Sequence, residues 1–105
     1  MDFAVDDDIR KASTLPGRFY SDPEVFATLR EKLFAKSWQL VGDSDRLKAP
    51  GRVCPVSFLD GSIDEPLLLT RDAQDVLHCI SNVCTHRGNI LCESESVEQV
   101  LRCRY

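Results

Sequence analysis

The residues with the clearest capacity for chemistry are Cys84, His86 and Cys103, which lie in the segments NVCTHRGN and RCRY near the end of the sequence. Two ligands separated by one residue in a loop can both face one metal centre, and a second loop can then close over its other side. Gly88 follows the first pair and permits a tight backbone turn beside such a centre. Thiolates together with imidazole favour zinc or iron–sulfur sites over calcium or magnesium sites.

Two kinds of metal site fit this pattern. One is a tetrahedral zinc site, which has the right number of ligands here but lacks the usual closely spaced cysteine pair. Its four ligands would be Cys84, His86, Cys92 and Cys103. The other is part of an iron–sulfur centre of the Rieske type, in which Cys-x-His in one loop is joined by Cys-x-x-His in another, so that two imidazoles hold one iron. In this second interpretation the second imidazole would follow Tyr105 directly.

The segment from Thr14 to Tyr105 resembles a known family. NVCTHRGN followed by RCRY is similar to the Rieske motif C-x-H-R-G…C-x-Y-H-G. The stretch TLPGRFYSDPEVFATLREKLFAKSWQLVGD resembles the N-terminal lead-in of the α subunits of Rieske non-haem iron oxygenases, which are the aromatic-ring-hydroxylating and choline-monooxygenase-like enzymes. This lead-in distinguishes oxygenase subunits from free-standing Rieske ferredoxins.

The resemblance implies a role for each matched residue. Cys84 and Cys103 would hold the inner iron of a [2Fe-2S] cluster as thiolates, and His86 would be one of two imidazoles on the outer iron. Arg87 would shape the first loop together with the glycine that follows it. Tyr105 would lie near the cluster, where a phenol can donate a hydrogen bond to a sulfur and tune its potential.

The resemblance also implies parts that this sequence does not include: the second imidazole, and a catalytic domain with a mononuclear Fe(II) held by two His and one carboxylate. We therefore expect a fragment, cut within the second cluster loop, that belongs to an oxidoreductase, has no complete active site and binds a cluster weakly or not at all. The full-length protein would be a homo-oligomer that takes electrons from a ferredoxin or flavin reductase and oxidises a small organic substrate with O2. A stand-alone Rieske ferredoxin and a structural zinc module are the alternatives.

Composition and charge set further limits. A chain of 105 residues has room for one modest domain, and its net charge of −4 comes without the basic stripe typical of proteins that bind nucleic acid or anionic membranes. The longest apolar runs, such as Leu67 to Leu69, are far too short to span a membrane. The first residues, MDFAVDDD, lack a secretory signal, and five cysteines cannot form a complete disulfide framework. These features predict a cytoplasmic protein with reduced thiols.

Two elements should precede the cluster loops. Residues 1–20 form a leader, and residues 21–36 form a helix that Ser21 or Asp22 caps and Pro23 begins. Apolar residues recur on this helix at the spacing of a packing stripe: Val25, Phe26, Leu29, Leu33 and Phe34. Trp38 should close the stripe by packing against it. Residues 37–105 then form a truncated Rieske domain, so the expected fold is mainly β with an N-terminal α-helix, an incomplete antiparallel β domain of the Rieske type.

The strands of this domain can be placed from the pattern of apolar residues. RVCPVSF predicts a strand that ends in an Asp60-Gly61 turn, and EPLLLTRD and DVLHCISN predict two paired strands joined around residues 72–74. Apolar residues on both faces of 76–80 are typical of an inner strand. His78 should therefore be a packed or hydrogen-bonded core residue. Cys54 and Cys79 should act as small hydrophobic residues, and Cys92 should be a loop bystander unless the zinc site exists.

Overall fold

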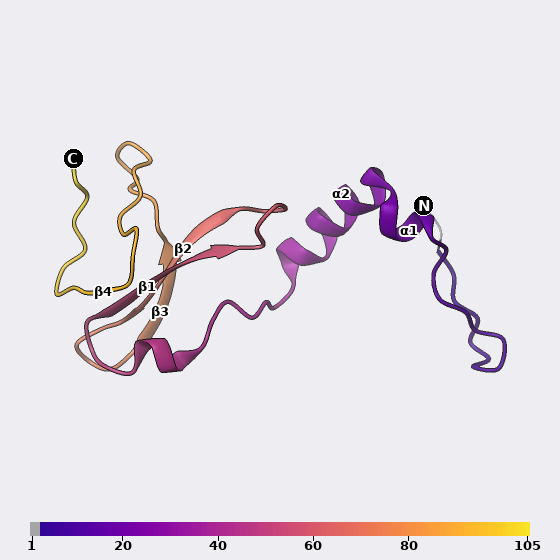
Figure 1. The fold of residues 1–105 in the computed structure, drawn as a ribbon, viewed down its shortest axis with the longest axis horizontal. Coiled ribbons are helices and arrows are strands. Elements are labelled where there is room, and N and C mark those ends of the chain that lie inside the picture. The colour runs from indigo at the N-terminus through magenta and orange to yellow at the C-terminus, as the bar shows by residue number, and fades with distance from the viewer. Residues whose placement is uncertain (1–2) are drawn as a thin grey trace. The chain divides into compact units, whose positions relative to one another are not determined.

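A computed structural model describes residues 3–105 of the chain. The chain divides into two compact units, Met1–Gln39 and Leu40–Tyr105, and each is described by itself (Figure 1). The first contains the α-helices, and the second contains the β-sheet together with one 3-10 helix. None of the helices within residues 3–105 combines the length and the apolar character that a membrane crossing requires.

The first unit holds two α-helices, α1 (Arg18–Ser21) and α2 (Pro23–Lys32), followed by a short 3-10 helix, η1 (Phe34–Lys36). Asp22 caps α2, because its carboxylate accepts a hydrogen bond from the backbone N–H of Glu24 at 2.9 Å, and Pro23 occupies the first turn. The single helix expected over residues 21–36 is thus divided in the structure. The α-helical pattern ends at Leu33, where φ is −113°, and the chain tightens into the 3-10 turn.

The apolar stripe of α2 is only partly buried. Val25 is buried, at 3% exposure, whereas Phe26 and Leu33 are each about half exposed. The prediction that Trp38 packs against this stripe is wrong, since its side chain is fully exposed. The cause is local: Ser37 adopts an extended conformation with ψ of 161°, so the chain has left the helical path before Trp38.

The second unit is built on a four-stranded antiparallel sheet in the order β3-β2-β1-β4 (Figure 1). The strands are β1 (Arg52–Phe58), β2 (Glu65–Arg71), β3 (Leu77–Ser81) and β4 (Ser96–Val97), and a 3-10 helix, η2 (Ser44–Leu47), precedes them. The expected fold, mainly antiparallel β with an N-terminal α-helix, is confirmed. The paired strands predicted on either side of residues 72–74 are β2 and β3.

The core of this unit is small and lies around β1 and β2. Leu68 of β2 and Cys54 of β1 are completely buried, and Val53 is nearly so. Leu47 of η2, which contacts both strands, is buried beside them at 3% exposure. The burial of Cys54 confirms its prediction as a small hydrophobic residue, and burial also raises the pKa of its thiol.

The prediction of an inner strand over residues 76–80 is wrong. Within the described residues β3 lies at the edge of the sheet, where it pairs only with β2, and every residue of β3 is exposed. His78 and Cys79 are therefore not core residues, although the ring of His78 is hydrogen-bonded. Apolar residues on both faces of a short run do not distinguish an inner strand from an edge strand, because that difference depends on the neighbouring strand and not on the run itself.

Candidate metal centre

Cys84 and His86 lie in a short loop that begins directly after β3. Val83 and Ile90 form a β-bridge at its base. Inside it, the backbone N–H of Cys84 donates to the carbonyl of Asn89 at 2.7 Å, and Gly88 N–H donates to the carbonyl of Cys84 at 2.8 Å. The second bond closes a turn that needs a positive φ at its last residue, and Gly88 has φ of 68°. The sequence therefore folds back on itself around Cys84.

Asn82 anchors this loop to the sheet. It is buried, at 3% exposure. Its side-chain amide donates to the carbonyl of Cys92 at 2.7 Å and its side-chain oxygen accepts from the N–H of Cys92 at 2.9 Å. Its own N–H donates to the carbonyl of Pro66 at 2.9 Å, in the strand next to β3. Sequence reasoning missed Asn82, because a polar residue before a loop gives no sign that it will be buried and paired.

The second segment, around Cys103, has no regular secondary structure and meets the first loop through side chains. The side-chain amide of Asn89 donates to Sγ of Cys103 at 3.8 Å. The guanidinium of Arg87 lies 5.3 Å from the centre of the Tyr105 ring, a cation–π contact. These two contacts join loop to segment, so residues far apart in the sequence lie side by side at this site.

The surroundings of the Cys103 sulfur favour its thiolate form. The pKa of the Cys103 thiol lies below its ordinary value, chiefly because the backbone N–H of Tyr105 donates to the sulfur. Partial desolvation opposes this shift, and the Cys84 thiol and the Asn89 amide add to it as further donors. Cys84 and Cys103 are both half-buried, and the contact of Asn89 with the Cys103 sulfur brings the segment of Cys103 against the loop that carries Cys84. Tyr105 contributes through its backbone, while its ring contacts Arg87.

The structure brings together the two cysteines but not all three predicted ligands. His86 is exposed in the loop, two residues beyond Cys84. Within residues 3–105 no three Cys, His, Asp or Glu side chains are gathered as they would be around a metal ion. Two adjacent thiols and a nearby imidazole nevertheless supply the soft donor set that an iron–sulfur cluster requires, so these residues fit such a group chemically.

Cys92 does not complete a zinc site with these residues. Its thiol donates to the carbonyl of Ser94 at 3.0 Å and lies 3.8 Å from the hydroxyl of Ser96. Its backbone is held by Asn82, at the base of the loop instead of at its tip. The four-ligand arrangement expected for tetrahedral zinc is therefore not formed in the described part of the chain.

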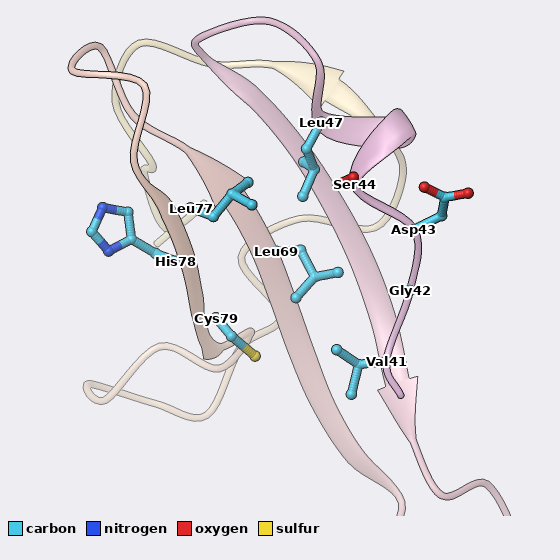
Figure 2. A pocket seen from close by; sticks show the side chains of 9 residues that line it. All are labelled: Val41, Gly42, Asp43, Ser44, Leu47, Leu69, Leu77, His78 and Cys79. Atoms are coloured by element: carbon cyan, nitrogen blue, oxygen red, sulfur yellow. The ribbon is translucent and has the colours of Figure 1, made fainter. Parts of the chain in front are cut away.

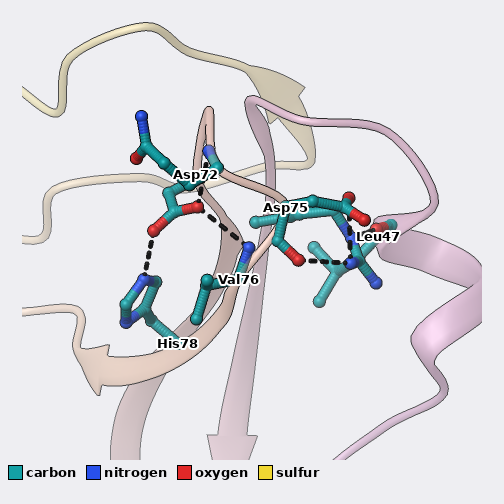
Figure 3. A network of polar contacts seen from close by, with 7 residues as sticks. Leu47, Asp72, Asp75, Val76 and His78 are labelled. Carbon is teal, nitrogen blue, oxygen red and sulfur yellow. Dashed lines mark hydrogen bonds and ion pairs between the residues drawn. The ribbon is translucent and has the colours of Figure 1, made fainter.

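Another polar cluster lies at the turn between β2 and β3 (Figure 3). The carboxylate of Asp72 contacts Nε2 of His78 at 2.7 Å and accepts from the backbone N–H groups of Gln74 and Val76, each at 2.9 Å. The pKa of Asp72 is lowered, first by the hydrogen bond from His78 and then by the Val76 N–H. All of these bonds lie within one hairpin, so the cluster shapes a turn.

A hollow of about 290 Å³ opens on one face of the sheet (Figure 2). It is lined by Val41, Gly42, Asp43, Ser44, Leu47, Leu69, Leu77, His78 and Cys79. The side chains of Leu47 and Leu69 form its apolar interior, while the ring of His78 points away from it toward Asp72. Its ionisable lining residues, Asp43, His78 and Cys79, are not brought together as a metal-binding group within the described part of the chain, so the two-cysteine site remains the better candidate for chemistry.

Comparison with known proteins agrees with this choice. Residues 37–105 match the family model of the Rieske [2Fe-2S] domain. The chain is 33% identical over 93 residues to choline monooxygenase of Amaranthus tricolor and covers 20% of that protein, using 88% of its own length. It is 35% identical over 97 residues to the carnitine monooxygenase oxygenase subunit of Escherichia coli strain K12, using 91% of its length and covering 25% of that protein.

A solved structure shares the fold. The apo form of the quaternary ammonium Rieske monooxygenase CntA superposes with a TM-score of 0.77 at 33% identity, over 90% of this chain and 26% of that one. The chain therefore spans about a fifth to a quarter of the length of the relatives it matches.

Proposed function

This chain belongs to the Rieske [2Fe-2S] domain family, and we propose that it is the electron-transfer part of a Rieske oxygenase α subunit. The group that defines the family is a [2Fe-2S] cluster, which accepts and releases one electron at a time. The observation that carries the proposal is the neighbouring pair of thiols, Cys84 and Cys103, which come from separate segments within the region that matches the family. The lead-in before that region is part of the similarity to oxygenase subunits.

Cys84 and Cys103 would hold the inner iron, and His86 would hold the outer iron. The exposure of His86 suits an imidazole at the end through which electrons enter and leave. Asn89 donates to the Cys103 sulfur and accepts from the Cys84 backbone, so it would fix the positions of both thiolates. Hydrogen bonds to cluster sulfurs are one of the main means by which a protein sets the reduction potential.

The second imidazole and the catalytic iron would come from residues outside this sequence. This part of the proposal is supported by coverage, since the chain accounts for about 20% of choline monooxygenase and 26% of CntA. The full-length protein would pass electrons from a ferredoxin or flavin reductase to a mononuclear iron, as a homo-oligomer in a reducing compartment such as the cytoplasm. Its substrate would be a small quaternary ammonium compound, the class named for CntA.

The proposal is tested by reconstituting the purified chain with iron and sulfide under anaerobic conditions. Because this chain supplies one of the two imidazoles of a Rieske centre, imidazole is included in the reconstitution buffer. We then expect visible absorption from thiolate-to-iron charge transfer and, after reduction, an EPR signal with the low average g value of a Rieske centre. Cys84→Ser and Cys103→Ser should abolish both signals. Cys92→Ser is the matched control, because this cysteine lies outside the proposed ligand set, and it should leave them unchanged. Loss of the signals in Cys92→Ser alone, or a colourless chain that binds zinc through four ligands, would contradict the proposal.

A further inference from the structure

We propose that Cys84 and Cys103 form a reversible disulfide when no cluster is bound, so that the same two sulfurs serve as a thiol–disulfide site. The bridge itself follows from the geometry of the chain without a metal. Its consequence rests on the proposed function: two sulfurs joined in a disulfide cannot ligate iron, so the bridged form of the chain cannot bind a cluster.

The contacts around the two thiols favour this pairing. The side-chain amide of Asn89 in the first loop donates to the sulfur of Cys103, and the Cys84 thiol is among the groups that lower the pKa of Cys103. Asn89 contacts both cysteines. Its backbone carbonyl accepts a hydrogen bond from the N–H of Cys84 at 2.7 Å, and its side-chain amide donates to Sγ of Cys103 at 3.8 Å. Arg87 and Tyr105 make a separate contact between the same loop and segment. The two thiols are therefore held at a high effective concentration for reaction with each other.

The local backbone allows the last approach. An S–S bond is only ~2 Å long, and both cysteines are free thiols in the structure, so one segment must move toward the other. Residues 98–105 contain no helix or strand, and Cys103 lies near their end. The loop around Cys84 is closed by backbone hydrogen bonds, so movement is expected in the segment that carries Cys103.

The other cysteines are poorer partners. Cys54 is completely buried within the sheet. Cys79 is exposed on the edge strand β3, and its neighbours across the strands do not include another thiol. The thiol of Cys92 is hydrogen-bonded to the carbonyl of Ser94 in its own turn. The inference therefore concerns one pair among the five cysteines of the chain.

The reaction with oxidised glutathione balances as two thiol–disulfide exchanges. One thiolate of the pair attacks a sulfur of oxidised glutathione, breaks its S–S bond and releases one glutathione, leaving a mixed disulfide on the chain. The second thiolate then attacks the protein sulfur of that mixed disulfide and releases the second glutathione. The chain loses two electrons and two protons, and oxidised glutathione gains both.

The test is to incubate the metal-free full chain with oxidised and reduced glutathione at fixed ratios, block the remaining thiols and analyse the chain by mass spectrometry. We expect a loss of about 2 Da in the bridged species. Protease digestion should give one main cross-linked peptide pair, with Cys84 in one peptide and Cys103 in the other. A chain that accumulates only glutathione adducts, or a bridge that maps mainly to another pair, would overturn the inference.

Variants separate this geometry from general thiol reactivity. Cys92→Ser should leave the Cys84–Cys103 peptide pair unchanged. Asn89→Ala should lower the equilibrium yield of the bridge several-fold, because it removes the side-chain tie between the two partners, whereas Thr85→Ala, an exposed change in the same loop, should not. An unchanged yield in Asn89→Ala would contradict the positioning argument. The mapping requires no cluster, so failure of reconstitution alone would count against the proposed function and not against the bridge.

Discussion

Asn82 is the residue on which the geometry of the first loop depends most directly. The side-chain amide of Asn82 makes two hydrogen bonds to the backbone of Cys92, one to its carbonyl and one from its N–H. The amide thus acts as a clamp that joins the two ends of the loop segment. A buried amide is favourable only when its groups are paired, and here they are. The clamp fixes the base of the loop, while Asn89 joins its far end to Cys103.

Replacing Asn82 by Ala should destabilise the second unit by about 1–3 kcal/mol, because the N–H and carbonyl of Cys92 lose their partner. The midpoint of urea unfolding, followed by far-ultraviolet circular dichroism, measures this change. Gln99→Ala is the control, since the side chain of Gln99 is exposed, and it should change stability by less than about 0.5 kcal/mol. Equal midpoints for the two variants would show that the clamp contributes nothing.

At this scale the sequence identified the groups that could bind a metal but not those that position them. Cys84 and Cys103 could be singled out because their type and spacing carry chemistry in themselves. Asn82 and Asn89 act through distances of 2.7 to 3.8 Å to residues that are remote in the sequence. Such contacts exist only after the chain has folded, and most asparagines are exposed, so the residue type alone does not predict a buried, paired amide.

The hairpin of β2 and β3 shows how a single carboxylate can define an element. Asp72 receives two backbone N–H groups of its own turn and the ring of His78 from β3, so its charged form is favoured by hydrogen bonds from three directions (Figure 3). The turn residues were predictable from their composition. The pairing of Asp72 with His78 was not, because it depends on the register in which His78 lies opposite Thr70.

The hairpin should lose stability in acid. The pKa of Asp72 in the folded chain is below the ordinary 3.8, mainly because of the hydrogen bond from His78, so its contribution is present above that value. It is lost as the pH falls through the lowered pKa. Urea midpoints measured from pH 5 down to about pH 2 should fall less steeply in Asp72→Asn than in the unmodified chain. Asp60→Asn, an exposed change in the other hairpin, should keep the original slope.

The edge strand β3 is the element for which sequence and structure differ most. Apolar residues over 76–80 suggested burial on both faces, yet Leu77 and Ile80 of β3, and Val76 just before it, are each 39–50% exposed. An exposed, apolar edge strand offers unpaired N–H and carbonyl groups to other chains, so we expect the chain to self-associate through β3. The amino-acid sequence does not reveal that β3 is an edge strand, because the same pattern of residues also occurs in inner strands.

A charge on β3 should therefore reduce self-association of the chain. Leu77→Glu places a carboxylate on the edge and directly opposite Arg71 of β2, where the cross-strand pair is favourable. Size-exclusion chromatography with light scattering should show a larger monomer fraction than for the unmodified chain at the same concentration. Leu68→Ala is the contrasting change: it truncates a completely buried side chain and should lower stability by about 2–5 kcal/mol without increasing the monomer fraction. A monomer fraction unaffected by Leu77→Glu would exclude β3 as the contact.

For the molecule as a whole, the motif and the lead-in were sufficient to indicate the family, and the match over residues 37–105 establishes it. The motif and the lead-in could not indicate which residue supplies the remaining ligand of the cluster. The chain supplies two thiols that lie together and one exposed imidazole, and it covers about a fifth of choline monooxygenase. A Rieske cluster needs two imidazoles, so under our proposal the outer iron would have one open position when only this chain is present.

This open position leads to a prediction that the purified chain can test. Imidazole added during reconstitution should occupy it, so the chain should retain more iron and sulfide through gel filtration than the same chain in an imidazole-free buffer of equal pH and ionic strength. Without imidazole, iron and sulfide should fall short of the amount for one cluster per chain, because an iron that lacks one of its direct ligands is held less tightly. His86→Ala should be rescued in part by imidazole, which can replace both nitrogen ligands. Cys84→Ser should not be rescued, since imidazole cannot replace the thiolate that anchors the inner iron. Equal cluster content with and without imidazole, in the unmodified chain and in His86→Ala, would show that His86 is not a ligand.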